Sequence, residues 1–150
     1  MDTFEPGEQE GDALRGARKR RYAMLEAIGE VEVALSSPVG EPTWHSQLEV
    51  RLLGLRLALE QHVDEVEGTD GLLAELLAES PRLANQIRRI EAEHPALATQ
   101  VDGSIELVAA ELEPGVVRAS VMETLAAMSR HRQQGADLVY EAYKVDIGGG

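Results

Sequence analysis

Apolar residues recur every three or four positions along most of this 150-residue chain, the spacing that places them on one face of an α-helix. Pro, Gly and Ser residues interrupt the pattern at 36–40, 68–71, 80–81 and 113–115. No segment alternates apolar and polar residues as a half-buried strand does. The pattern therefore predicts an all-α protein with four long helical blocks and a short helical piece at 72–79.

The apolar positions of each block form a seam on one side of the expected helix. In the first block the seam consists of Leu14, Ala17, Leu25, Ile28 and Leu35. The later seams run from His45 through His62 to Val66, from Leu83 through His94 to Val108, and from Val117 through His131 to Ala142. Because short connections join the blocks, these seams predict an antiparallel up-down four-helix bundle over residues 13–143.

The two ends of the chain depart from this pattern. Residues 1–12 are rich in acidic residues, Gly and Pro, and carry too little apolar surface to offset the entropy of ordering, so we expect a disordered acidic tail. Residues 144–150 end in three glycines, and here we expect a flexible C-terminal tail. The sequence thus predicts one domain between two unstructured ends.

Composition and charge exclude several classes of protein. The chain has no cysteine, which removes disulfides, thiolate metal sites and cysteine nucleophiles. A formal charge of −13 and only five aromatic side chains (one Phe, one Trp, three Tyr) argue against nucleic-acid binding. The chain has no apolar run of membrane-spanning length and no basic, apolar secretory signal, so we expect a cytoplasmic protein without membrane association. Hydrolase and phosphate-loop motifs are also missing, which argues against an enzyme.

All four histidines of the chain fall on the apolar seams. An imidazole inside a bundle must be hydrogen-bonded or act as a ligand, because leaving it unpaired costs a few kcal/mol. His45 lies seventeen residues before His62 on the same helix, roughly 25 Å along its axis, so these two cannot share a metal. We expect a capping or boundary role for His45 and a shared site for His62, His94 and His131.

Carboxylates at helical spacing accompany two of these three histidines. Glu65 follows His62 by three residues, and Glu91 precedes His94 by three, so each pair can reach one ion from one helix face. The helix of His131 offers no comparable second ligand. The predicted metal ligands are His62, Glu65, Glu91, His94 and His131.

The order of these features resembles a hemerythrin-like (HHE cation-binding) domain. The match is clearest between residues 59 and 97, where a histidine followed by acidic residues precedes a Glu-His pair about thirty residues on, and the helix around His131 resembles the last helix of that family. The resemblance implies a non-haem iron centre used for oxygen or redox sensing or for iron handling, with His62, His94 and His131 as ligands. The chain departs from the family at three places. The first helix has no histidine, and Gly135 stands at the usual fourth-helix carboxylate position. Val66 stands at the usual second-helix carboxylate position, so this carboxylate is displaced to Glu65 or Glu67. The resemblance therefore implies a reduced site, with one metal on the three histidines and Glu65.

Two classes of function follow from these observations. The first is a metal-binding bundle, with iron as the expected metal. The second is a metal-free helical module that self-associates or binds a protein partner, and it is motivated by the missing ligands and the aliphatic seams. A basic stretch at residues 15–21 is either a solvated helix face or a docking patch for an acidic partner. Whether the three imidazoles converge on one point separates the two classes.

Overall fold

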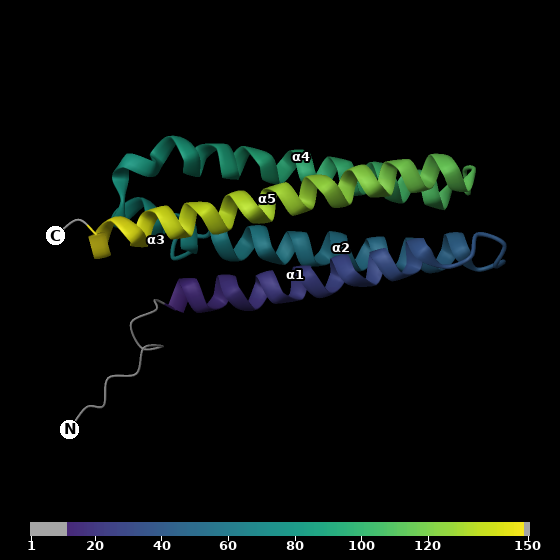
Figure 1. Ribbon diagram of the computed structural model, residues 1–150, viewed down its shortest axis with the longest axis horizontal. Helices are drawn as coiled ribbons and strands as arrows, with labels where there is room; N and C mark the ends of the chain where they lie inside the picture. Colours follow the sequence, from purple (N-terminus) through teal and green to yellow (C-terminus); the bar gives the residue numbers. More distant parts are fainter. Residues whose placement is uncertain (1–11, 149–150) are drawn as a thin grey trace, which may run out of the picture.

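The computed structural model describes residues 12–148, with the side chains of 12–14, 17, 20–21 and 145–148 excepted. Within this range the elements are α1 (Asp12–Ser36), α2 (Trp44–Glu67), α3 (Leu72–Glu79), η2 (Pro81–Leu83), α4 (Ala84–Ala109) and α5 (Pro114–Gly148). Every regular element of this range is helical, which confirms the predicted all-α class. Figure 1 shows the four long helices α1, α2, α4 and α5 lying alongside one another.

The breaks between helices fall where the sequence places residues that disfavour helix. The α1–α2 loop contains Pro38 and Gly40, and the α2–α3 loop contains Gly68 and Gly71. α5 begins at Pro114, a position where the missing amide hydrogen of proline costs nothing. All four predicted interruptions are confirmed.

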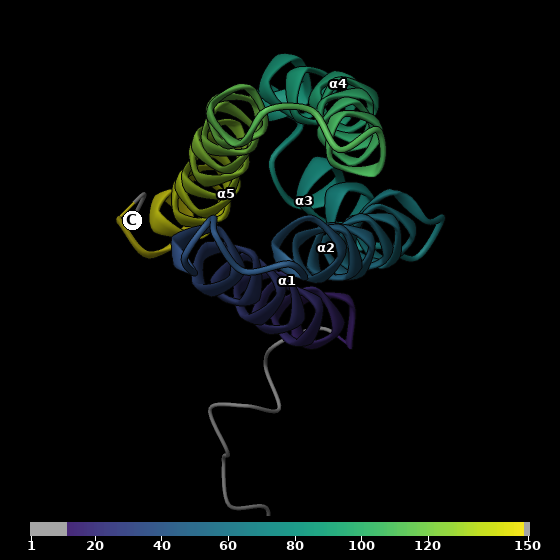
Figure 2. The same cartoon turned by 90° about the vertical axis from the view of Figure 1, so that its right-hand side faces the viewer.

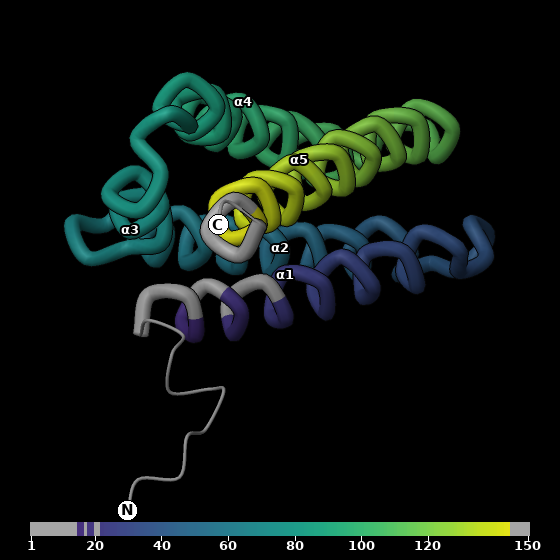
Figure 3. The backbone as a smooth tube through the Cα atoms, turned by 60° about the vertical axis from the view of Figure 1, so that its left-hand side comes forward, coloured from purple at the N-terminus to yellow at the C-terminus, as the bar shows by residue number. Residues whose placement is uncertain are grey.

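The long helices surround a common interior, as the end view in Figure 2 shows. α2 packs against both α1 and α4, and α4 packs against α5. The short helix α3 packs mainly against α2, and Figure 3 shows it at the end of the bundle where α1 begins and α5 ends. This end therefore has an additional helical wall that the opposite end lacks.

The apolar core consists of two separate clusters along the bundle. The larger cluster includes Leu59, Leu97 and Met128. The smaller one includes Val66, Ile90 and Leu138 together with Leu72, Leu73 and Leu76, called the α3 leucines below. On each of α2, α4 and α5 the histidine of the seam lies in sequence between a member of one cluster and a member of the other. The three histidines thus form a layer between two aliphatic cores.

The predicted seams of the last three blocks are buried almost throughout, whereas the predicted seam of the first block is partly wrong. Leu25 is 38% exposed, while Met24 and Val31 are buried. Met24, Ile28, Val31 and Leu35 follow a four-three-four spacing, and Leu25 is turned about 100° from this face. The side chains of Leu14 and Ala17 lie outside the described part of the chain.

The predicted tails fall mostly at the edges of the described range. Of the predicted acidic tail, only Asp12 is described, and it is the first residue of α1. Residues 144–148 of the predicted C-terminal tail belong to α5. Within the described range, no helix combines the length and apolar content needed to cross a lipid bilayer.

Glycines in the middle of helices offer a test of this packing. A Cβ at Gly29 would meet no atom within 4 Å, so Gly29→Ala should stabilise α1 by about 0.5–1 kcal/mol through helix propensity alone. The midpoint of thermal unfolding should rise by about 1–4 °C. Gly71→Ala, in the α2–α3 loop, is the contrasting variant, because its Cβ would lie 2.5 Å from the backbone carbonyl oxygen of Glu65, which cannot rotate aside as a side chain can. An equal gain in the two variants would contradict this packing of the loop.

Candidate metal centre

Three helices each contribute one histidine to a single cluster: His62 from α2, His94 from α4 and His131 from α5. One ring nitrogen of each lies within 4.8 Å of the corresponding nitrogens of the other two. The ring centroids are 4.8 Å apart for His94 and His131, 5.6 Å for His62 and His94, and 5.9 Å for His62 and His131. The predicted convergence of the three imidazoles is confirmed.

His94 is the most deeply buried of the three, with 2% of its surface exposed. Among the described residues, neither of its ring nitrogens has a hydrogen-bond partner. Its Nδ1 lies 3.3 Å from Oε1 of Glu67, within ion-pair distance but outside hydrogen-bonding geometry. Burial lowers the pKa of His94 to about 4, with the charge of His131 adding to this effect and that of Glu93 opposing it. The ring is therefore neutral near pH 7, so its contact with Glu67 is no ion pair there.

His131 is held by a carboxylate from the neighbouring helix. Its Nδ1 lies 2.7 Å from Oε1 of Glu93 on α4, and because a carboxylate only accepts, Nδ1 is the donor. The amide of Gln134, in the orientation that satisfies its surroundings, donates to the same carboxylate. This hydrogen bond fixes the tautomer of His131 and leaves the lone pair of Nε2 for a ligand, as in other carboxylate–histidine–metal arrangements.

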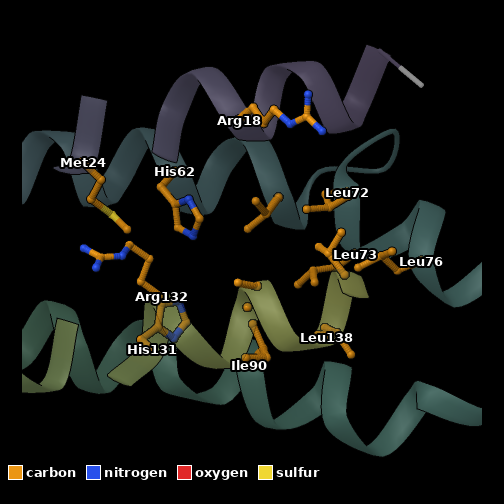
Figure 4. A pocket seen from close by; sticks show the side chains of 14 residues that line it. Arg18, Met24, His62, Leu72, Leu73, Leu76, Ile90, His131, Arg132 and Leu138 are labelled. Atoms are coloured by element: carbon orange, nitrogen blue, oxygen red, sulfur yellow. The ribbon is translucent and has the colours of Figure 1, made fainter. Parts of the chain in front are cut away.

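His62 is only half-buried and borders a cavity that His131 also lines. The cavity has a volume of about 130 Å³. Figure 4 shows His62 and His131 on one side of this space and the α3 residues Leu72, Leu73 and Leu76 on the other. The histidine cluster is therefore reached from the end of the bundle that α3 covers.

The two predicted carboxylate ligands, Glu65 and Glu91, differ in their surroundings. Glu65 is directed toward α1, where its carboxylate packs against Gly16, and Glu91 is exposed on α4. Neither belongs to the group of residues whose ligand atoms converge. Whether either carboxylate binds a metal stays a prediction.

Two other carboxylates, Glu67 and Glu93, lie beside the cluster instead. Desolvation, together with the charge of Asp64, raises the pKa of Glu67. Glu67 and Glu93 each contact a histidine on a different helix. The family resemblance offers Glu67 as one position of the displaced second-helix carboxylate, whereas helical spacing within one segment does not single out Glu93. Glu93 directly precedes His94 in the sequence, yet its carboxylate reaches His131.

His45 lies apart from the cluster, at the start of α2. Its Nε2 donates to the carbonyl of Leu112 over 2.7 Å, which ties the beginning of α2 to the α4–α5 loop. Its ring also packs edge-on against Trp44, with 5.0 Å between centroids. The predicted boundary role of His45 is confirmed.

The donor set of the cluster fits a transition-metal ion. Imidazole suits iron, zinc, copper and nickel, and a buried ring with two unpaired nitrogens, such as His94, gains a partner when a metal binds. Metal–nitrogen bonds near 2.1 Å require ligand atoms no more than about 4.2 Å apart. The present spread of up to 4.8 Å must therefore contract slightly, which side-chain rotation can supply.

No family model, curated protein or solved structure matches this chain.

The burial of His94 predicts a loss of stability in mild acid. The unfolded chain takes up a proton as the pH falls through the ordinary histidine pKa of 6.5, whereas folded His94 does not until about pH 4. Over this interval the free energy of unfolding should decrease by about 3 kcal/mol on account of this residue. Urea unfolding of chelator-treated protein at pH 7 and pH 4.5 measures the effect. His94→Leu should remove most of this difference in unfolding free energy between the two pH values. An unchanged difference in His94→Leu would contradict the role of His94. His45→Leu serves as the control and should keep the difference.

Proposed function

We propose that this protein binds one divalent first-row transition-metal ion through His62, His94 and His131. The observation that carries the proposal is the convergence of three imidazoles from three helices, one of them neutral, buried and unpaired at both nitrogens within the described structure. A histidine in that state destabilises the apo protein, so a ligand that coordinates it offsets part of the desolvation cost. A purely structural core would place an aliphatic residue there at lower cost.

Iron is the metal that the family resemblance implies, and the imidazole donors accept it. Three protein ligands leave coordination positions open, as in catalytic rather than structural metal sites. Open positions suit oxygen or redox sensing and iron handling, the uses that the resemblance implies. Among the residues that the structure describes, the converging group contains three histidines and no carboxylate, which supports one metal rather than a pair.

The proposal includes the antiparallel up-down order of the four long helices. Across α1 and α2, Glu30 pairs with Arg51, while the earlier Gly16 lies against the later Glu65. Across α4 and α5, Ser104 bonds Thr124, while the earlier Glu93 bonds the later His131. In each pair of helices, an earlier residue on one partner meets a later residue on the other, which supports opposite directions.

Metal titration of chelator-treated protein tests the proposal. We expect one equivalent of Co²⁺ or Zn²⁺ per chain, the visible spectrum of low-coordinate Co²⁺, and stabilisation by about 2.7 kcal/mol at a hundredfold excess over Kd. Anaerobic Fe²⁺ should bind at the same stoichiometry. His62→Ala, His94→Ala and His131→Ala should each abolish stoichiometric binding, because the two histidines that remain cannot hold the ion by themselves. His45→Ala is the matched control and should bind as the parent does. Equal binding by all four variants would refute the site.

The hydrogen bond from His131 to Glu93 gives a second, finer test. Glu93→Gln should weaken metal binding by about 10- to 100-fold. A neutral amide holds the imidazole of His131 less firmly than a carboxylate does, and it raises the basicity of that imidazole less. Glu91→Gln, two residues away on the exposed side of α4, should leave the affinity unchanged. Isothermal titration calorimetry with Zn²⁺ separates the two variants. If Glu91→Gln instead weakens Zn²⁺ binding, the result would support Glu91 as a metal ligand, as helical spacing predicted.

A second candidate function is self-association as a metal-free helical module. It is favoured by Val50, Leu53 and Leu57, which are 51–60% exposed and share one outer face of α2. Sedimentation velocity over a range of concentrations tests it, with Leu53→Glu as the variant that should dissociate an oligomer formed through this face. A chain that stays monomeric and binds metal would leave only the first function standing.

A further inference from the structure

The cavity beside the histidines combines an apolar interior with cationic side chains. Aliphatic side chains from all five α-helices line most of its wall, including Met24, Val66, Ile90 and the α3 leucines (Figure 4). The polar residues of the wall are His62 and His131, Arg18 on α1 and Arg132 on α5. A space of this composition suits a ligand with an apolar body and one negative charge.

The two arginines also line a groove beside the cavity. A surface groove between α1 and α5 is lined by Arg18, Tyr22 and Leu25 on one side and by Arg132 and Ala136 on the other. Arg18, Arg132 and Ala136 line both the groove and the cavity, so the two spaces are neighbours that share part of their walls.

Arg132 is available to such a ligand. It forms no ion pair or hydrogen bond with any residue that the structure describes, although the chain carries thirteen more negative than positive charges. A guanidinium presents a planar pair of donors that matches a carboxylate. Arg18, one residue of the basic stretch 15–21, also lines the cavity.

The volume limits the size of the apolar body. An apolar protein cavity of about 150 Å³ holds one benzene molecule, so a space of about 130 Å³ accepts about five or six carbon atoms. Long acyl chains are excluded by this size, and very short ones leave part of the wall without contacts.

We propose that this cavity binds a short-chain aliphatic monocarboxylate of about six carbons, with its carboxylate toward Arg132 and its alkyl chain against the apolar wall and the edges of His62 and His131. The binding needs no metal, because every contact comes from side chains of the protein. It is therefore independent of the proposed metal function, and either can fail without the other.

Calorimetric titration of chelator-treated protein with acetate, butyrate, hexanoate and decanoate tests the proposal. Affinity should increase about fourfold per added methylene up to hexanoate, the gain expected from burying each group, and decanoate should lose it. Hexanol and hexylammonium, with the same chain and no negative charge, should bind at least tenfold more weakly than hexanoate. In histidine-selective NMR spectra, hexanoate should shift the imidazole signals of His62 and His131 while leaving His45 unchanged.

Two variants locate the ligand. Arg132→Gln should weaken hexanoate binding about tenfold or more through the lost charge-assisted hydrogen bond. Gly135→Leu should abolish binding, because Gly135 lines the cavity and a side chain there has open space to occupy. Gly54→Leu places the same side chain on α2, away from this cavity and equally free of neighbours, and should bind hexanoate as the parent does. The proposal is overturned if hexanoate does not bind, if affinity is independent of chain length, or if Gly135→Leu retains it.

Discussion

Burying an imidazole ring in an aliphatic core costs free energy unless its nitrogens find partners, and the interior of this protein contains a layer of three such rings. His62, His94 and His131 separate a larger apolar cluster from a smaller one, so the seam of each contributing helix changes from aliphatic to polar and back. The aliphatic clusters on both sides fix the register of α2, α4 and α5. That register is what brings one histidine from each helix to the same level.

The electrostatics of the layer follow from where its carboxylates lie. Glu93 and Glu67 approach the cluster from partly exposed positions, so the histidines have acidic neighbours without a carboxylate inside the converging group. Glu93 selects the tautomer of His131, whereas burial keeps His94 neutral. His94 is therefore neutral at neutral pH, the state in which imidazole coordinates a metal. The cavity beside α3 borders this layer at His62 and His131. These two residues therefore line the cavity and also belong to the proposed metal site.

Sequence patterns predicted most of the fold because apolar periodicity reports directly on helix faces. Leu83, Val108 and Val117 were placed in the interior by spacing alone, and none has more than 1% of its surface exposed. The first helix was predicted less well, because several registers of its small and apolar residues give similar faces, and contact with α2 selects the one containing Met24 and Val31. The carboxylates were the hardest part. In a chain with 27 acidic residues, helical spacing marks Glu65 and Glu91, but neither belongs to the group of ligand atoms that converges among the described residues.

The sequence by itself therefore determined the helical class, the positions of the breaks and the inward placement of three histidines, since each depends on residues close together along the chain. Only the tertiary structure decided that the three rings meet, that Glu93 on α4 reaches His131 on α5, and that a cavity opens beside them. These features depend on the relative rotation and axial shift of separate helices. Such rotations and shifts are set by the packing of the whole core, and no local stretch of sequence encodes them.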